Sequence, residues 1–438
     1  MSVSYAKPQS TRYQMNSWFA WVVCMVGALF FFYEFLQMNI FNPISQDLLQ
    51  AFNIDSTGLG YLSSMYFYGD FLIVIPAGML LDRYSTKLLI FISMLACSIA
   101  TVVFAFTDSF YIASFARFVE GLGAGFCFLA SIRLASRWFT ANHLAFVTGA
   151  IVTMAMLGGM VAQTPMAFLT EHYGWRYAMV LNGVLGLIIM AVIMLVVKDR
   201  PNAGGAEVKS EESHLKKFGV MHSLWFVLKN RNNWFGGLYT TLMNLPIFIL
   251  GALWGMMYLE QIHGLSHDQA SYVTSVLFIG VIFGSPFFGW FSDRIRSRKK
   301  PMILGALSSL VVVLILLYVP GLSLTSLLVL SFLLGFLTSS QIISYPAVAE
   351  LNPIELTGSV VSIISLTIMA SGAIVQPLTG WLIQLHWDHH TMLNDKPLYL
   401  ASDYNAAMIV MPISFVVSLL FACIMKETGC KSEYEHLK

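Results

Sequence analysis

The sequence predicts an all-α polytopic membrane protein with twelve transmembrane helices in two pseudo-symmetric six-helix bundles. Its composition is the first reason: 57% of the 438 residues are hydrophobic and 11% are charged, whereas soluble globular chains carry about 25% charged residues. The second reason is spacing, because the charges cluster and leave apolar runs of about 20 residues, the length that crosses a bilayer. The third is a polar motif that occurs twice. A soluble domain is excluded, and the net charge of +1 gives no indication of nucleic-acid binding.

Twelve apolar runs are long enough to be spanning helices. We expect them near residues 17–40, 58–80, 87–106, 110–136, 144–168, 175–197, 234–259, 270–291, 301–319, 323–348, 357–384 and 404–425. The longest connection is polar and rich in Lys, Glu, Gly and Ser, and it separates six helices from six. The predicted organisation is therefore a tail (1–16), a first bundle (17–197), a linker (198–233), a second bundle (234–425) and a tail (426–438).

The basic residues predict the orientation of these helices. Of the 24 Lys and Arg residues, 21 fall at one side if both termini lie together, two (Arg176 and Lys396) fall at the other, and Arg117 lies within the membrane. Because Lys and Arg concentrate in cytoplasmic loops, both termini are expected in the cytoplasm, in a cell inner (cytoplasmic) membrane.

The repeated motif is Gly-x-x-x-Asp-Arg followed by further basic residues. It occurs from Gly78 to Lys87 and again from Gly289 to Arg298, each time after the second apolar run of its half. One copy is weak evidence, but two copies at equivalent places indicate an internal duplication. Here the sequence resembles the major facilitator superfamily (MFS) of secondary transporters, whose signature loop between helices 2 and 3 has this form. Ser85 stands where that family usually has Gly.

The resemblance covers residues 15–428 and is supported by other echoes between the halves. Gly159 to Pro165 in the fifth run resembles Gly372 to Pro377 in the eleventh. It implies two similar bundles with a substrate site between them near the membrane midplane. It also implies a cytoplasmic latch between the halves, formed by Gly78, Asp82, Arg83, Lys87, Gly289, Asp293 and Arg294.

Four ionisable residues are expected at membrane depth: Glu34, Asp70, Arg117 and Glu120. An ionisable side chain there is costly and needs a partner, a watery cavity or a function. Their counterparts in the second half are neutral: Leu250, Val281, Ser331 and Leu334. The first half is therefore expected to hold the proton-coupling machinery. A static ion pair between helices is the alternative.

Depth along the helices suggests how these charges pair. At about 1.5 Å per residue, Glu34 and Arg117 lie at similar depths in helices 1 and 4, so a Glu34–Arg117 pair is allowed. Glu120 lies three residues after Arg117, where it can pair along the same helix. The motif from Arg117 to Gly123 resembles the helix 4 motif of the family, whose Arg is often linked to proton coupling.

Neutral polar and aromatic residues within the spans are candidate substrate ligands, although each alone is more often a packing residue. They are Tyr33, Gln37, Tyr66, Gln163, Asn244, Trp254, Tyr258, Gln341, Tyr345 and Gln376.

Other chemistries are not indicated. The five cysteines have no metal-ligand spacing, and no Walker-type phosphate loop occurs, so neither a cofactor nor ATP is expected. The run from His386 to His390 falls in a polar loop, where metal binding is not expected. Without a catalytic cluster at a water interface, the chain is not expected to be an enzyme.

The predicted function is secondary active transport of a small polar organic solute, an organic anion or an amino-acid-like zwitterion, by proton-coupled uptake. The stretches from Tyr173 to Tyr177 and from Lys198 to Pro201 resemble the anion:cation symporter branch of the superfamily. The alternatives are an exporter or antiporter of a metabolite or drug, and a non-transporting receptor-like protein. A monomer in contact with membrane lipid is expected, with the proton as coupling ion.

Overall fold

The computed structural model describes residues 17–139, 141–199, 227–353, 356–388, 392–393, 396–397 and 399–431. Within these residues, twelve helical stretches are long and apolar enough to cross a membrane. They begin and end within several residues of the expected spans, so the predicted fold class is confirmed. Several predictions lie outside the described residues: the tail 1–16, most of the linker, the Asp82 side chain, and His389 and His390.

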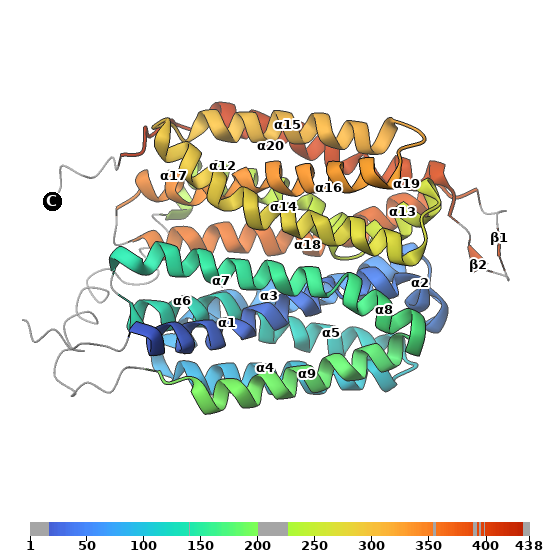
Figure 1. Cartoon of the computed structure of the whole chain (residues 1–438), viewed down its shortest axis with the longest axis horizontal. Coiled ribbons are helices and arrows are strands. Elements are labelled where there is room, and N and C mark those ends of the chain that lie inside the picture. The colour runs from blue at the N-terminus through green and yellow to red at the C-terminus, as the bar shows by residue number, and fades with distance from the viewer. Residues whose placement is uncertain are drawn as a thin grey trace, which may run out of the picture.

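The helices follow each other in the order that Figure 1 shows. The first half contains α1 (Ser17–Asn39), α2 (Phe41–Ala51), α3 (Ser56–Arg83), α4 (Thr86–Phe106), α5 (Phe110–Ala124), α6 (Cys127–Trp138), α7 (Ala141–Val161), α8 (Thr164–Tyr173) and α9 (Trp175–Val196). The second half contains α12 (Arg231–Met243), the π-helical segment η1 (Ile247–Gly251), α13 (Gly255–His263), α14 (His267–Arg294), α15 (Lys299–Tyr318), α16 (Leu324–Thr338), the 3-10 segment η2 (Ser339–Ile343), α17 (Ser344–Glu350), α18 (Thr357–His386), the short strands β1 (Met392–Leu393) and β2 (Lys396–Pro397), α19 (Ala401–Met408) and α20 (Val410–Ile424).

Several spans that the sequence predicts as continuous helices are interrupted. The fourth span divides into α5 and α6 around Gly125, and the fifth divides into α7 and α8 before Thr164. The seventh passes from α12 through η1 to α13, and the tenth passes through η2. Such breaks are tolerated at membrane depth where the freed backbone groups find partners within the protein.

The two halves pack their own helices in corresponding ways. In the first half, Gly121 of α5 lies so close to α3 that a Cβ there would approach the Tyr66 carbonyl oxygen to 1.9 Å. In the second half, a Cβ on Gly335 of α16 would approach the Leu277 carbonyl oxygen of α14 to the same 1.9 Å. Helix 4 on helix 2 and helix 10 on helix 8 therefore use the same glycine contact, as expected for close helix packing in membranes.

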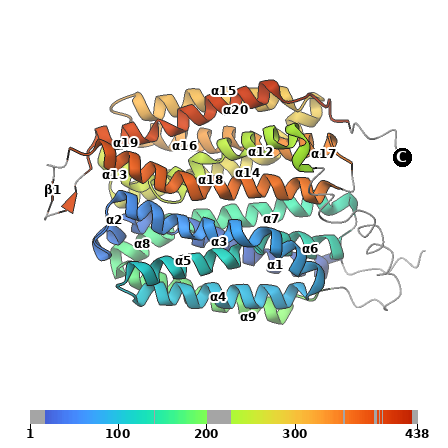
Figure 2. The ribbon, with the colours of Figure 1, turned by 180° about the vertical axis from the view of Figure 1, so that it is seen from behind.

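The halves join at one end of the molecule, which we call the closed end; α2, α8 and α13 lie there in both Figures 1 and 2, opposite the C-terminus. Hydrogen bonds between the halves gather at this end. Gln46 Nε2 donates to Glu260 Oε2 (2.8 Å), Ser56 Oγ donates to the Gly380 carbonyl (2.8 Å), and the Thr164 and Ser275 hydroxyls lie 2.8 Å apart. We call the opposite end, near the C-terminus, the tail end.

The predicted latch residues lie at the tail end, and the contacts of those whose side chains the structure describes stay within their own halves in this conformation. Within the described part of the chain, a Cβ on Gly78 or on Gly289 would meet no atom within 4 Å, so no described helix packs against either position. Asp293 pairs with Arg298 of its own half (2.7 Å), and the Arg294 guanidinium lies over the Trp290 ring. The latch stays a prediction for a conformation in which the tail end is closed.

The chain after α20 returns to the second signature loop through Glu427. Its carboxylate accepts hydrogen bonds from Ser297 Oγ (2.5 Å) and from the backbone N–H groups of Arg298 (2.9 Å) and Lys299 (3.0 Å), at the start of α15. Partial burial opposes ionisation, but these bonds and one from the Gly429 N–H outweigh it and lower the pKa of Glu427 to about 2.

We expect Glu427→Gln to lower the melting temperature at neutral pH by roughly 2 °C. The lowered pKa favours the ionised carboxylate in the folded protein, so its contribution is complete above about pH 4.5 and declines as the pH falls toward 2. The melting temperatures of the two proteins, compared between pH 7 and pH 3, should therefore converge on acidification. A constant difference would contradict this assignment.

Candidate functional site

Arg117 and Glu120 form a buried ion pair on α5. Arg117 Nη1 lies 2.6 Å from Glu120 Oε2, and both side chains are fully buried. The guanidinium also lies against two aromatic rings, Phe41 at 4.1 Å and Tyr66 at 5.0 Å from the Arg117 Cζ atom. Its Nε and Nη2 atoms have no hydrogen-bond partner among the described residues. These two atoms form the edge of a guanidinium that binds a carboxylate through two parallel hydrogen bonds.

Gln37 connects this pair to three neighbouring helices. Its backbone carbonyl accepts from Arg117 Nη1 (3.1 Å), and its Nε2 donates to the Thr101 hydroxyl of α4 (2.6 Å). Thr101 in turn donates to Glu120 Oε1 (2.9 Å), and Asn182 of α9 donates to Gln37 Oε1 (3.0 Å). Gln37 Nε2 also donates to the Tyr33 hydroxyl (2.7 Å). Because the Gln37 amide and the Thr101 hydroxyl each donate and accept within it, the network positions the ion pair between these helices.

Glu34 belongs to a separate group of contacts, and Arg117 takes Glu120 in place of the Glu34–Arg117 pair that depth alone allows. The Tyr66 hydroxyl lies 3.0 Å from the Glu34 carbonyl oxygen and 3.4 Å from its Oε2, and the Cys97 thiol lies 3.1 Å from its Oε1. Equal depth in the membrane does not fix the direction in which a side chain points. The i,i+3 partner Glu120 therefore takes Arg117, as the alternative expectation had it.

Asp70 is the one of the four predicted ionisable residues that has no polar partner among the described residues. It lies on α3, is 7% exposed, and faces the break between α5 and α6, since a Cβ on Gly125 would lie 3.1 Å from its Oδ1. An acid at membrane depth without a partner is costly and is by default a functional candidate.

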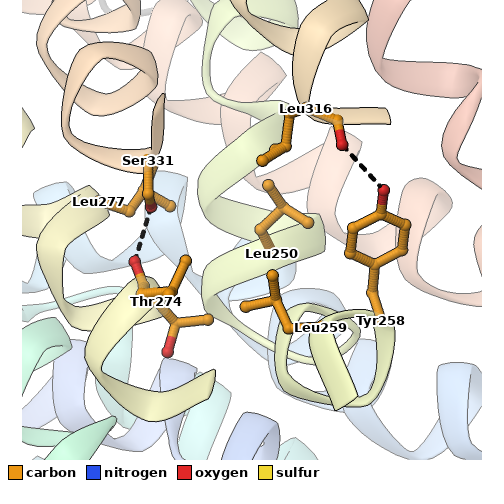
Figure 3. A pocket seen from close by; sticks show the side chains of 8 residues that line it. Leu250, Tyr258, Leu259, Thr274, Leu277, Leu316 and Ser331 are labelled. Carbon is orange, nitrogen blue, oxygen red and sulfur yellow. Dashed lines mark hydrogen bonds between the residues drawn. The ribbon is translucent and has the colours of Figure 1, made fainter. Parts of the chain in front are cut away.

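The corresponding region of the second half is neutral. Leu250 and Ser331, the counterparts of Glu34 and Arg117, line a small cavity together with Tyr258 and Leu316. Figure 3 shows Ser331 of α16 bonded to the backbone of α14, where its hydroxyl donates to the Val273 carbonyl (2.6 Å). The free space is about 10 Å³, which is the room that one water molecule needs. The duplicated fold therefore holds charge at this position in its first half only.

Two of the predicted neutral ligands bond to the η1 segment, Gln163 from the first half and Gln376 from the second. Gln163 Nε2 donates to the Gly251 carbonyl (2.8 Å), and Gln376 Nε2 donates to the Phe248 carbonyl (2.5 Å), so both amides bind the η1 segment. Both side chains are fully buried. In this conformation, therefore, both amides are occupied by η1, and their role as substrate ligands is a prediction for another conformation.

The other neutral candidates lie in the second half. Gln341 Nε2 donates to Asn244 Oδ1 (2.9 Å) where η2 faces the end of α12, and Tyr345 lies half-buried one turn further along. Tyr258 donates to the Leu316 carbonyl (3.3 Å). Trp254 is fully buried, and its Nε1 has no partner within the described part of the chain. Asn244 and Gln341 thus form a neutral amide pair that offers donors and acceptors without charge.

Sequence reasoning missed three residues of the buried network: Cys97, Thr101 and Asn182. The Cys97 thiol donates to Glu34 Oε1 (3.1 Å). Thr101 follows Cys97 by four residues on α4, so both lie on the helix face that meets the acids. This i,i+4 pair of small polar residues was the available signal, but such pairs are also common in simple helix packing.

The fold is a duplicated bundle of twelve spans. The first half carries the four ionisable residues at membrane depth, and the second half has neutral residues at the corresponding positions. A site between two repeats near the midplane is the plan of a secondary membrane transporter. The chain belongs to the Major Facilitator Superfamily, whose sequence pattern matches residues 27–259 and 236–432. The predicted family is confirmed, and the chain is a multi-pass membrane protein of a transporter family and not an enzyme.

Individual relatives give the same picture. A probable galactarate/D-glucarate transporter of Escherichia coli is 26% identical over 305 residues (61% of this chain, 66% of the relative), and a gentisate transporter of Corynebacterium glutamicum is 25% identical over 368 residues (83% and 81%). A membrane sensor protein of Salmonella typhimurium is 23% identical over 298 residues (63% and 64%). The matches to the first and third span just under two thirds of those proteins.

A solved structure shares the fold. The crystal structure of a bacterial homologue of the human lysosomal transporter Spinster, in an inward-facing and unoccupied conformation, superimposes with a TM-score of 0.73 over 93% of this chain and 95% of that one. The sequences are 16% identical, so this similarity shows the fold alone.

Proposed function

We propose that this protein is a secondary active transporter that takes up a small organic anion together with protons by alternating access. One observation carries the proposal: the Nε–Nη2 edge of Arg117 is buried and unpaired among the described residues. Glu120 already compensates the charge of Arg117 through Nη1, so the free edge is suited to a carboxylate from outside the protein.

The named substrates of the transporter relatives support this choice of ligand. Galactarate, D-glucarate and gentisate are carboxylates that also carry hydroxyl groups. Arg117 supplies the group for the carboxylate, and the neutral Asn244–Gln341 pair supplies hydrogen bonds for hydroxyls (2.9 Å within the pair). Asp70 and Glu34 are the candidates for the coupled proton.

The proposed direction rests on orientation and on the closed end. The sequence assigns 21 of the 24 basic residues to the side of the membrane that holds both signature loops. The described residues of these loops lie at the tail end, so we infer that this end faces the cytoplasm in a bacterial inner membrane. The closed end then faces outward.

The sensor relative favours a second candidate, a membrane receptor that binds the anion without transporting it.

A thermal-stability screen of the purified protein tests the ligand class. Ligands that bind only the folded protein raise its melting temperature by mass action. We expect hydroxylated carboxylates to stabilise the protein and the matching amides not to. Arg117→Lys should weaken the binding of the stabilising carboxylate at least about tenfold, since Lys cannot form the two parallel hydrogen bonds.

The result that would overturn this ligand class is equal stabilisation of the wild type and Arg117→Lys by carboxylates, or stabilisation by cations alone. Counterflow of the stabilising anion in proteoliposomes then separates the two functions: a transporter exchanges internal for external anion, and a receptor binds it without exchange.

A further inference from the structure

Asn42 is the central polar contact of the closed end. Its Nδ2 donates across the interface to the Leu250 carbonyl (2.8 Å) and within its own half to Gln163 Oε1 (2.7 Å). Its Oδ1 accepts from the Met256 backbone N–H (3.0 Å) of the opposite half. The side chain is 1% exposed. Because buried hydrogen bonds are strong and directional, this amide fixes α2 of the first half to the interrupted seventh span of the second.

The seventh span is built to accept these bonds. Between α12 and α13 it passes through the π-helical segment η1, and a Cβ on Gly255 would lie 1.9 Å from the Leu250 carbonyl oxygen, so only glycine fits the break. The carbonyl oxygens of Leu250 and Gly251 accept from Asn42 and Gln163 of the first half. Two amides of one half thus hold two neighbouring backbone carbonyls of the other.

The residue before Asn42 contacts the buried charge. The Phe41 ring lies 4.1 Å from the Arg117 Cζ atom. Phe41 and Asn42 share the first turn of α2, which Ile40 separates from α1. Successive residues of an α-helix project about 100° apart, so Phe41 faces Arg117 inside the first half while Asn42 faces the second half.

We propose that the first turn of α2 couples Arg117 to the gate at the closed end. The Phe41 ring moves with the guanidinium that it contacts, and the Asn42 hydrogen bonds to the Leu250 carbonyl and the Met256 N–H form or break accordingly. When an anion takes the free edge of Arg117, the guanidinium shifts against Phe41, α2 turns, and the Asn42 bonds across the interface break. The anion part of this sequence rests on the proposed function, whereas the mechanical link between the three side chains does not.

The link is tested without any ligand by measuring the opening of the closed end. Ser275→Cys places a thiol at the interface between the halves, where Ser275 is 7% exposed and contacts Thr164. Its labelling by a membrane-impermeant maleimide in intact cells reports the opening rate, with the unmodified chain as background. Gln261→Cys, at an exposed position of α13, shows whether the reagent reaches the closed end from outside the cell. If Gln261→Cys is labelled only in inverted vesicles, the proposed orientation is refuted, and the labelling rates of Ser275→Cys are then measured in those vesicles.

We expect Asn42→Ala to raise the labelling rate about tenfold or more, because it removes two hydrogen bonds across the interface. Arg117→Lys should raise it severalfold, since Lys lacks the planar group that stacks on Phe41. If the link exists, Arg117→Lys adds nothing in the Asn42→Ala background. Phe41→Leu removes the ring and leaves the Arg117–Glu120 ion pair unchanged. If Arg117→Lys does not fold, the double-mutant cycle of Phe41→Leu with Asn42→Ala tests the link on the same labelling rate.

Gln46→Ala is the matched control, because Gln46 lies on the same helix and bonds across the interface to Glu260 at an exposed position. The fold-changes that Gln46→Ala and Arg117→Lys cause in the labelling rate should multiply in the double variant, because Gln46 is not part of the proposed link. The proposal is overturned if the effects of Arg117→Lys and Asn42→Ala also multiply, or if neither Arg117→Lys nor Phe41→Leu changes the rate. Absence of anion binding in the thermal screen would refute the proposed function and leave this cycle valid.

Discussion

Arg117→Ala is expected to destabilise the protein by about 3–5 kcal/mol, because it leaves the Glu120 carboxylate buried without its charged partner. The Glu120 side chain is fully buried, and among the described residues it would retain the hydrogen bond from Thr101 alone (2.9 Å). The loss is a large fraction of the stability of an ordinary folded protein, so most of the variant should aggregate during purification. Fluorescence-detected gel filtration after heating measures the decrease.

The partner of Arg117 is identified by rescue. Glu120→Gln in the same chain should restore part of the stability, with an interaction free energy of about 0.5–3 kcal/mol in a double-mutant cycle. Glu34→Gln is the matched control: it neutralises a carboxylate of equal burial that binds Tyr66 and Cys97 instead. Equal rescue by the two changes, or rescue by Glu34→Gln alone, would contradict the pairing seen here.

The twelve spans, the duplication and the neutral second half were predictable because each leaves a local trace in the sequence. Apolar length marks a span, and the repeated Gly-x-x-x-Asp-Arg marks the two halves. Leu250 and Ser331 at the counterparts of Glu34 and Arg117 already indicated that the second half is neutral where the first is charged.

The helix breaks were not predictable from the same patterns. Gly121 and Gly125 lie four residues apart in one apolar run, yet Gly121 packs against the Tyr66 carbonyl and Gly125 ends α5. A glycine without a Cβ suits both purposes, and only the contacts of the folded protein distinguish them. The same holds for η1, whose residues Ile247 to Gly251 read as ordinary apolar helix.

The pairing of the buried charges and the role of the amides depended on direction as well as depth. Gln163 was expected among the substrate ligands because it is polar and lies within a span, but its amide is occupied by the Gly251 carbonyl. Asn42 was missed altogether, since it lies at the end of its span, where a polar residue requires no special explanation. The roles of both residues depend on hydrogen bonds to backbone groups of the second half, which the sequence does not reveal.

Asp70→Asn is expected to abolish proton-driven accumulation of the anion while sparing its exchange across the membrane. Asp70 lies in the middle of α3 with 7% exposure and no polar partner among the described residues, so it is free to gain and lose a proton as the protein changes conformation. Asn has the same size and cannot titrate, which removes the coupled proton and leaves the anion site intact. In proteoliposomes with an inward proton gradient and no membrane potential, the internal and external anion concentrations should become equal, as uncoupled transport requires at equilibrium, while counterflow continues. Asp108→Asn, where the carboxyl side chain is 88% exposed, should accumulate the anion as the wild type does. Undiminished accumulation by Asp70→Asn would remove Asp70 from the coupling mechanism and leave Glu34 and Glu120 as the remaining acids at membrane depth.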